Sequence, residues 1–399
     1  MKDVSISFIP GTRQPHIDMF MKLIEPLQER FRITIVPQGG EFLIATPSIY
    51  YKMSAENWKF FIEESKKSCT IMYSFVECIQ PNFTWFDYYI GFHEPADFDR
   101  IIRAPYYMED RKKLANTKKQ VDEILQEKTG FCNFIYSNAQ ADPLRDQIFH
   151  ALCGYKKVDA LGKHLHNAES TVISPRYGGD WFLGSIEMKK PYKFSIAIEN
   201  AVSSGYASEK IVSSMLGNTI PIYYGDPNIS EKYNPKSFID CRKFDSLDSL
   251  VEFVSYLDSN DDAYKKMMAE PWITPEQVRK DEDEVKSFLA AVATMFEKKE
   301  RRRSNGPINE YDIELWQHIP NSINLEKNVA TPPTIKKDEK QPIDEDMMRV
   351  IRAGVRSLKR KRNYYRFIAN FFVGKRRRKY SNKKKAYSTL IDKANKTFK

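Results

Sequence analysis

The sequence predicts an α/β fold with two parallel-sheet domains, a linker and a basic helical tail. Short stretches rich in β-branched and aromatic residues alternate with helical patterns, which is typical of parallel sheets covered by helices. The alternation occurs twice, and a polar, lysine-rich stretch separates the two series. Prolines and mixed charges dominate after residue 300. We therefore expect domains at 1–127 and 128–300, a linker at 301–346 and a tail at 347–399.

Each domain is expected to begin with a buried strand. In the first domain we predict helices and strands at the following positions: strands 4–9, 32–36, 42–46, 70–76 and 88–92, and helices 16–30 and 55–67. The lysine-rich stretch, 110–128, has a helical pattern. In the second domain we predict a strand at 131–136, a helix at 143–155, a loop over 156–190, strands at 194–198 and 220–224, and helices at 246–258 and 275–299.

Composition favours a protein of a reducing compartment. The chain of 399 residues contains five cysteines, an odd number, and none of them forms a Cys-x-x-Cys pair. The longest apolar runs are about as long as a strand, and the first residues lack the apolar core of a signal peptide, so we expect no membrane span. The net charge of +10 arises in the tail, because residues 349–399 hold 19 lysines and arginines and one acid.

Residues 194–240 carry the pattern around which the rest is organised. An apolar run, 194–198, ends in a Glu-Asn pair, a small-residue loop follows, and a helical pattern then leads to a second apolar run at 220–224. This is a βαβ unit whose ionisable groups lie where the first strand gives way to the helix: Glu199, Asn200, Tyr206, Glu209 and Lys210. Ligands of open α/β sheets bind at that edge, and the start of a helix favours anions.

The order and spacing of this stretch resemble the donor-binding segment of glycosyltransferase family 10, the α-1,3/4-fucosyltransferases. The shared pattern is a hydrophobic strand with Glu-Asn, then Tyr-x-x-Glu-Lys, Pro-Ile-Tyr-x-Gly-x-Pro and Asn-x-Lys-Ser-Phe-Ile. The resemblance implies a GT-B fold, in which two Rossmann-like domains face each other across a cleft. The N-terminal domain would bind the acceptor and the C-terminal domain GDP-fucose. Members from eukaryotes typically carry an N-terminal membrane anchor, so the chain looks like a bacterial, cytosol-facing member.

The start of the predicted helix supplies the leading donor ligands. Lys210 lies in the first turn and is expected to bind the diphosphate, where a helix N-terminus already favours an anion. By the resemblance, Glu209 would accept hydrogen bonds from the ribose, and Tyr206 would contact the nucleotide. Glu199 and Asn200 suit sugar hydroxyls. The alternatives are a solvated Glu-Lys pair beside a core tyrosine, and a turn or helix cap at 199–200.

Two further donor ligands are expected from the stretch before this unit. Lys163, in a segment that looks like a cation-supplying stretch of the family, is predicted to contact the diphosphate; the alternative is an exposed loop lysine. Ser137 and Asn138 end the first strand of the second domain and match a Ser-Asn of the family. We expect Asn138 to border the cleft, with Arg145 following on the helix.

Glu77 is the predicted general base. It ends a buried strand and precedes a Pro-Asn-Phe run, as a glutamate does in the family, although relatives often have Gly-Glu-Asn where this chain has Val-Glu-Cys. A carboxylate there can take the acceptor proton while GDP leaves from the opposite side, which inverts the anomeric centre. The alternative is a capping carboxylate. The Asp-x-Asp at 97–99 is too short a match to indicate a metal site, so we expect no metal or other cofactor.

The tail, 347–399, combines an apolar helical face with flanking cations, and resembles the membrane-resting tails of bacterial relatives. Nucleic-acid binding and a disordered solubilising tail are the alternatives. The resemblance implies an inverting α-1,3-fucosyltransferase that modifies GlcNAc of an N-acetyllactosamine-type glycan, such as a Lewis antigen on lipopolysaccharide, and the tail leads us to expect it at the inner face of the cytoplasmic membrane. The alternatives are another nucleotide-sugar donor, and a non-enzymatic protein acting through its tail.

Overall fold

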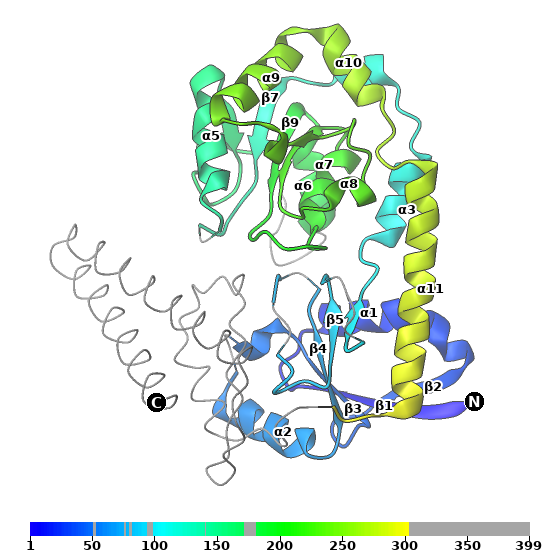
Figure 1. Cartoon of the computed structure of the whole chain (residues 1–399). Coiled ribbons are helices and arrows are strands. Elements are labelled where there is room, and N and C mark those ends of the chain that lie inside the picture. The colour runs from blue at the N-terminus through cyan, green and yellow to red at the C-terminus, as the bar shows by residue number, and fades with distance from the viewer. Residues whose placement is uncertain are drawn as a thin grey trace, which may run out of the picture. The chain divides into compact units, whose positions relative to one another are not determined.

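The computed structural model describes residues 1–50, 53–75, 77–79, 82–93, 99–139, 141–170 and 181–302 (Figure 1). The predicted tail at 347–399 lies outside these residues, as does the predicted linker apart from its first two positions. Within the described residues, no helix combines the length and the apolar character needed to cross a bilayer.

The first sheet has six parallel strands in the order β2-β1-β3-β4-β5-β6. Their bounds are β1 Lys2–Phe8, β2 Phe31–Ile35, β3 Phe42–Ala45, β4 Cys69–Tyr73, β5 Tyr88–Gly91 and β6 Ile101–Arg103. Its helices are α1 Gln14–Ile24 and α2 Ala55–Ser65, with 3₁₀ turns at Glu25–Glu29 and Pro47–Tyr50. The predicted helix at 16–30 is therefore wrong in its last turn, because Pro26 lacks the N–H that would continue the α-helical hydrogen bonds.

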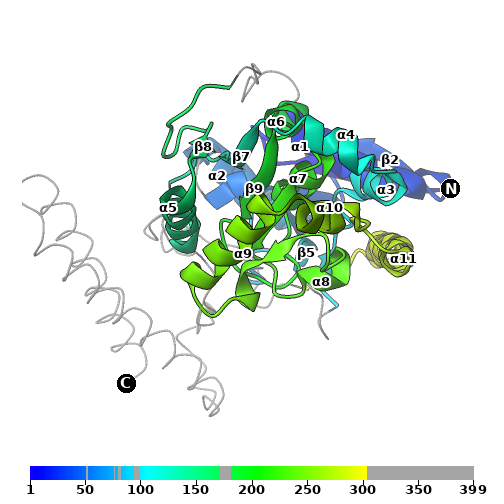
Figure 2. The ribbon, with the colours of Figure 1, turned by 90° about the horizontal axis from the view of Figure 1, so that it is seen from above.

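The second sheet has five parallel strands in the order β11-β10-β9-β7-β8. They are β7 Gly130–Phe134, β8 Val158–Ala160, β9 Tyr192–Ile198, β10 Ile220–Tyr224 and β11 Ile239–Asp240. The helices around it are α5 Leu144–Tyr155, α6 Trp181–Lys189, α7 Glu209–Leu216, α8 Ile229–Lys232, α9 Leu247–Ser259 and α10 Asp261–Ala269. Figure 2 shows α5 and α9 side by side, where they pack against each other.

Two further expectations about local structure were wrong. The stretch 110–128 is two helices, α3 Met108–Asn116 and α4 Val121–Gln126, because Thr117 adopts an extended backbone at the end of α3. The expected loop at 156–190 contains β8 and α6. Three residues are too few for β8 to show a strand period, and α6 has apolar side chains on all sides rather than along one stripe.

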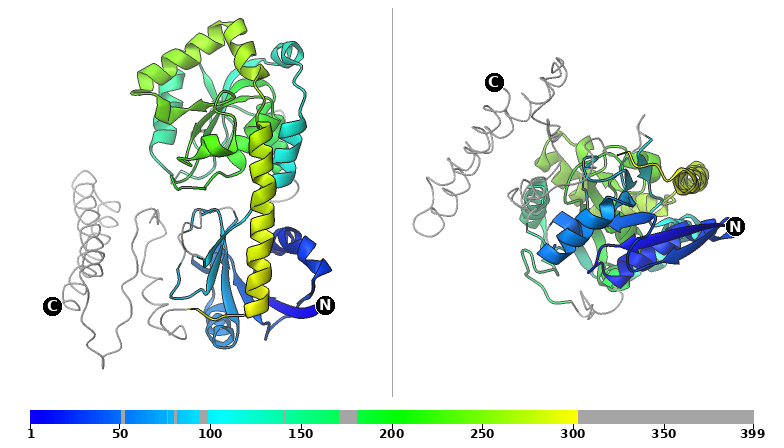
Figure 3. Two further views of the ribbon diagram at one scale, coloured as in Figure 1. Left: turned by 45° about the vertical axis from the view of Figure 1, so that its right-hand side comes forward. Right: turned by 90° about the horizontal axis from the view of Figure 1, so that it is seen from below.

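The long helix α11, Pro275–Lys298, connects the two halves of the fold (Figures 1 and 3). It begins with a capping box, in which Thr274 and Gln277 bind each other's backbone N–H groups, and with proline in its first turn. Its last turns pack in the core of the first sheet, where Phe296 contacts Phe31 and Phe42 with ring centroids 5.6 and 5.0 Å apart. The first sheet is thus completed by a helix that follows the second sheet in the chain.

Candidate active site

The second sheet reverses its strand order between β7 and β9. From β7 the chain moves outward to β8, then returns to the other side of β7 and continues to β10 and β11. In parallel α/β sheets, ligands bind outside the carboxyl ends of the strands at such a reversal. The segments that follow β7 and β9 carry Asn138 and Glu199-Asn200, respectively. The topology therefore brings three of the predicted donor ligands to one edge.

Glu199 is the buried centre of this edge. Its side chain has no exposed surface, and its carboxylate accepts hydrogen bonds from the backbone N–H of Ser208 (2.7 Å) and from the Ser208 hydroxyl (2.6 Å). It also pairs with the ammonium of Lys210 at 3.0 Å. These contacts tie the end of β9 to the residue that precedes α7. A carboxylate at this place satisfies one of the backbone donors left open at the helix start.

Lys210 lies between two carboxylates in the first turn of α7. Its ammonium is 3.0 Å from Glu199 and 3.4 Å from Glu209, and its side chain keeps 15% of its surface exposed. Burial opposes its protonation, but Glu199 and Glu209 together raise the pKa of Lys210 above its usual range. Burial likewise opposes ionisation of Glu209, and the adjacent Lys210 outweighs that effect and lowers the pKa of Glu209. Lys210 is therefore a permanent cation at a helix start.

Arg145 joins the ends of β7 and β9. Only 1% of its surface is exposed, and its guanidinium donates to the backbone oxygen of Asn138 and to the side-chain oxygen of Asn200 (3.3 Å). It lies over the ring of Tyr136, 4.3 Å from the centroid, and the Tyr136 hydroxyl is bonded to the backbone of β9. A second buried cation thus orients two of the predicted donor residues. From the sequence, Arg145 is expected near the cleft but with no assigned role.

Lys163 lies at the same edge but is exposed. Its loop is fixed there, because the N–H of His164 donates to the Tyr136 oxygen (2.9 Å) and the His164 ring contacts Asp146 (2.9 Å). The Lys163 side chain makes no hydrogen bond or ion pair with another residue in the described part of the chain. This position is compatible both with a ligand of the diphosphate and with an exposed loop lysine, so the role of Lys163 stays a prediction.

Tyr206 is fully buried and contacts the first half of the fold. Its ring meets Phe92, just after β5, edge to face with centroids 5.0 Å apart. Phe92, Ala201 and Tyr206 form a small apolar cluster, against which Cys78 and Tyr107 pack. Tyr206 therefore holds the loop before α7 against the carboxyl edge of the first sheet. This packing favours the interpretation of Tyr206 as a core residue at the border of the site.

Glu77 is half-buried and follows β4 on the first sheet. Burial raises the pKa of Glu77 above its usual range; the charge of Lys210 opposes this rise and that of Glu209 adds to it. These influences place Glu77 within electrostatic range of the α7 start, although the two lie on different sheets. A carboxylate with a raised pKa beside a cation is the environment in which enzymes keep a general base.

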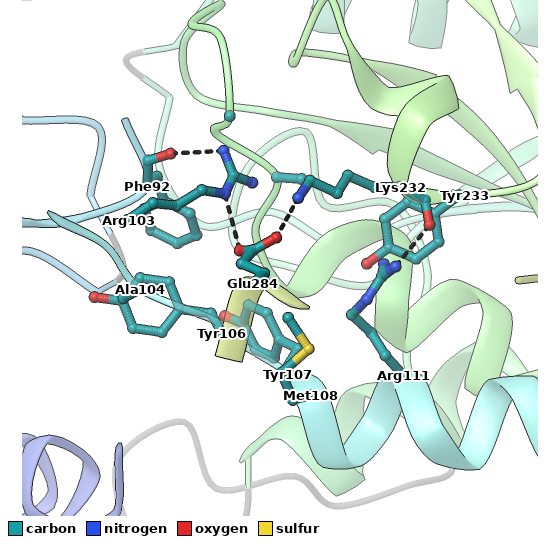
Figure 4. A pocket seen from close by; sticks show the side chains of 12 residues that line it. Phe92, Arg103, Ala104, Tyr106, Tyr107, Met108, Arg111, Lys232, Tyr233 and Glu284 are labelled. Atoms are coloured by element: carbon teal, nitrogen blue, oxygen red, sulfur yellow. Dashed lines mark hydrogen bonds and ion pairs between the residues drawn. The ribbon is translucent and has the colours of Figure 1, made fainter. Parts of the chain in front are cut away.

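A small pocket lies where the two halves of the fold meet (Figure 4). Its cavity volume is about 30 Å³, enough for about one water molecule. Glu284 of α11 accepts from Arg103 at the end of β6 (2.9 Å) and from Lys232 of α8, as the dashed lines show. Nearby, Arg111 of α3 binds Asp281 of α11 through two hydrogen bonds of 2.8 and 2.9 Å. We call these ion pairs, of Glu284 with Arg103 and Lys232 and of Asp281 with Arg111, the ionic clamp. The ionic clamp joins both sheets to α11.

The described residues contain no group of three or more His, Cys, Asp and Glu side chains placed to hold a metal ion. Of the Asp-x-Asp at 97–99, only Asp99 is described, and it pairs with Arg302 at 2.7 Å.

Comparison with known proteins relates the sequence of the second half of the fold to a family. Residues 125–310 match the model described as "Glycosyltransferase family 10 (fucosyltransferase) C-term". The chain is 30% identical over 223 residues to the alpha-(1,3)-fucosyltransferase FucT of Helicobacter pylori, covering 48% of this chain and 44% of that protein. It is 28% identical over 253 residues to GDP-fucose protein O-fucosyltransferase 3 of Xenopus laevis, covering 61% and 51%. The chain thus spans about half or less of the length of these relatives.

A solved structure shares the fold. An alpha1,3-fucosyltransferase crystallised with GDP superposes with a TM-score of 0.57 at 22% identity, covering 76% of this chain and 93% of that one. The two parallel, helix-covered sheets predicted as a GT-B arrangement are confirmed by this likeness and by the observed strand orders. Residues 125–310 therefore form a C-terminal domain of glycosyltransferase family 10, the fucosyltransferase family.

Proposed function

We propose that the protein is an inverting α-1,3-fucosyltransferase that moves L-fucose from GDP-fucose to a glycan hydroxyl. The observation that carries the proposal is the α7 start: a buried Glu199–Lys210–Glu209 cluster at the sheet reversal, with Glu77 of the other sheet within its electrostatic range. The family membership of residues 125–310 and the GDP and GDP-fucose named with the similar solved structures support this donor.

The donor diphosphate would lie at the N-terminus of α7. Lys210 would release part of its pairing with Glu199 and Glu209 to bind the phosphate oxygens, and the free N–H groups of the helix would add to the attraction. Arg145 donates to the Asn138 backbone oxygen and to the Asn200 side chain, and through these bonds it would hold both residues in place for the nucleotide and sugar. Glu209 would accept from the ribose hydroxyls. Because these cations can neutralise the leaving diphosphate, the reaction would need no metal ion, and chelation with EDTA is expected to leave turnover unchanged.

The acceptor would approach from the first sheet. There Glu77 would take the proton of the attacking hydroxyl while GDP leaves toward Lys210, on the opposite side of the sugar. Attack and departure on opposite faces invert the anomeric carbon. We propose GlcNAc of an N-acetyllactosamine-type glycan, as in a Lewis-type lipopolysaccharide, as the acceptor. A protein hydroxyl is the second candidate, because the Xenopus relative named as a protein O-fucosyltransferase aligns with 61% of this chain.

The basic tail, 347–399, would hold the enzyme on an anionic membrane surface at the cytoplasmic face. We expect no nucleic-acid partner, because aromatic residues alternate with the cations at helical spacing. Deletion of 347–399 is expected to abolish binding to vesicles of anionic phospholipid and to leave fucosyl transfer in solution intact. Loss of transfer by a folded truncated protein would contradict this division.

The direct test is fucosyl transfer from GDP-fucose to type 1 and type 2 N-acetyllactosamine acceptors and to a folded protein acceptor. Other nucleotide sugars serve as competing donors. We expect transfer only from GDP-fucose and preferentially to the type 2 glycan, with loss of turnover in Lys210→Ala. Turnover with another donor alone would assign a different glycosyltransferase activity, and transfer to the protein alone would establish the second candidate. The absence of any transfer would leave the non-enzymatic alternative.

A further inference from the structure

Lys189 is a buried lysine that the proposed chemistry leaves without a role. It ends α6, and only 5% of its surface is exposed. Its ammonium donates to the hydroxyl of Ser213 on α7, and that hydroxyl lies 3.3 Å from the backbone oxygen of Lys210. The two helices pack closely against each other, and both are labelled in Figure 1. Lys189 is thus linked through one side chain to the turn that carries Lys210.

The charges around Lys189 belong to the donor site. Glu209 and Lys210 act on it from α7, and Glu199 acts on it from the end of β9. A further cation, Lys128, donates to the oxygen of Gly217 just after α7 (3.4 Å). Lys190, just after α6, has an exposed side chain that pairs with Glu187 of α6. Burial raises the pKa of Glu199, whereas at Glu209 the effect of burial is outweighed by Lys210, which lowers the pKa, so Glu209 is the anion of this set that a charge on Lys189 would balance.

We propose that Lys189 is a positioning residue of the donor site, whose ammonium, held on Ser213, takes over the charge of Glu209 when Lys210 turns to the donor diphosphate. The inference rests on the proposed function, since it requires a diphosphate at the start of α7. A buried lysine costs free energy as a cation, and a nearby anion reduces that cost. The arrival of the diphosphate would therefore fix Lys189 in its charged form.

This role implies that donor binding takes up a proton. Burial lowers the pKa of Lys189 to about 7; Glu209 and Glu199 oppose that effect and Lys210 adds to it. Near neutral pH, a large share of the free protein therefore holds Lys189 uncharged. The negative diphosphate raises this pKa, so by linkage the affinity for the donor falls by up to about tenfold per pH unit above about pH 7. Below about pH 6, Lys189 is already charged, and the affinity is expected to level off.

Calorimetric titration with GDP-fucose, which has no phosphate that titrates near neutrality, tests the inference. Titration in two phosphate-free buffers of different ionisation enthalpy, between about pH 6 and pH 8.5, gives the number of protons bound with the donor. For the wild type we expect uptake that rises toward about one proton at the upper end. Lys189→Met should lose this uptake and bind about tenfold more weakly at pH 7, whereas Lys189→Arg, a permanent cation, should keep the affinity without the uptake. Lys190→Met is the matched control and should behave as the wild type.

The outcomes separate the two proposals. Binding by the wild type with no proton uptake across this range overturns the role of Lys189, and that measurement needs no variant to fold. Unchanged affinity and uptake in Lys189→Met overturn it as well, and leave the donor site in place. No binding of GDP-fucose by the wild type would instead remove the proposed donor, and this inference with it.

Discussion

Removal of the Glu199 carboxylate should loosen the whole α7 start. Glu199→Ala deletes a fully buried side chain that accepts two hydrogen bonds from Ser208 and pairs with Lys210 at 3.0 Å. Lys210 would keep one carboxylate partner, Glu209 at 3.4 Å, and its hydrogen bond to the Ser208 hydroxyl at 2.9 Å. Breaking one partner of a buried ion pair costs about 3–5 kcal/mol, because the other charge is left uncompensated. Glu199→Gln keeps one acceptor oxygen for the helix start and should cost less, about 1.5–3 kcal/mol.

Hydrogen–deuterium exchange measures this cost locally, which suits a fold with two sheets that need not unfold together. In Glu199→Ala, the protection of amides in peptides covering β9 and α7 should fall by about two to three and a half orders of magnitude, while peptides of the first sheet change little. Glu187→Ala, which breaks an exposed pair with Lys190, is the control and should change protection by less than about fivefold. A similarly small effect in Glu199→Ala would refute the reasoning that this carboxylate organises the site.

The remaining predictions concern the base, the buried arginine and the clamp. Glu77→Gln should reduce turnover by about 10²- to 10⁴-fold. Burial raises the pKa of Glu77 in the folded protein, so the protonated Glu77 side chain contributes to stability at low pH, and this contribution is lost as the pH rises through that pKa. The glutamine variant carries no charge and should therefore melt at a higher temperature than the wild type at pH 7. Arg145→Gln should raise the KM for GDP-fucose at least about tenfold, and Arg145→Lys should restore it only in part; equal KM values would remove Arg145 from the site. Asp281→Ala should destabilise the fold by about 3 kcal/mol in thermal melts, since it leaves the buried Arg111 guanidinium unpaired; a change below about 1 kcal/mol would show that the clamp is dispensable.

The sequence was most informative where local pattern and function coincide. The Glu-Asn pair and the Tyr-x-x-Glu-Lys run predicted a charged helix start after a strand, and the structure brings Glu199, Glu209 and Lys210 into contact there. The strands of four or more residues were predictable because buried parallel strands form continuous apolar runs, whereas the shorter strands β6, β8 and β11 were not predicted. Glu77 was placed at a strand end, and the structure adds that its surroundings include Lys210.

Other features depend on tertiary contacts that no local period reveals. In the sequence, Arg145 cannot be distinguished from any other cation on a helix. Only the fold brings it into contact with Asn200 at the end of β9. Lys189 lay in a stretch expected to be a loop, so its burial against α7 could not be inferred. The return of α11 to the first sheet was not predicted either, because its capping box and apolar stripe define a helix but not its partner.

The central claim is that the start of α7 grips the diphosphate of a guanosine nucleotide. A crystal structure of the protein with GDP tests it directly. We expect phosphate oxygens within about 3 Å of the Lys210 ammonium and of the first N–H groups of α7, with the ribose at Glu209. A nucleotide bound elsewhere, with Lys210 still paired only to Glu199 and Glu209, would contradict the account.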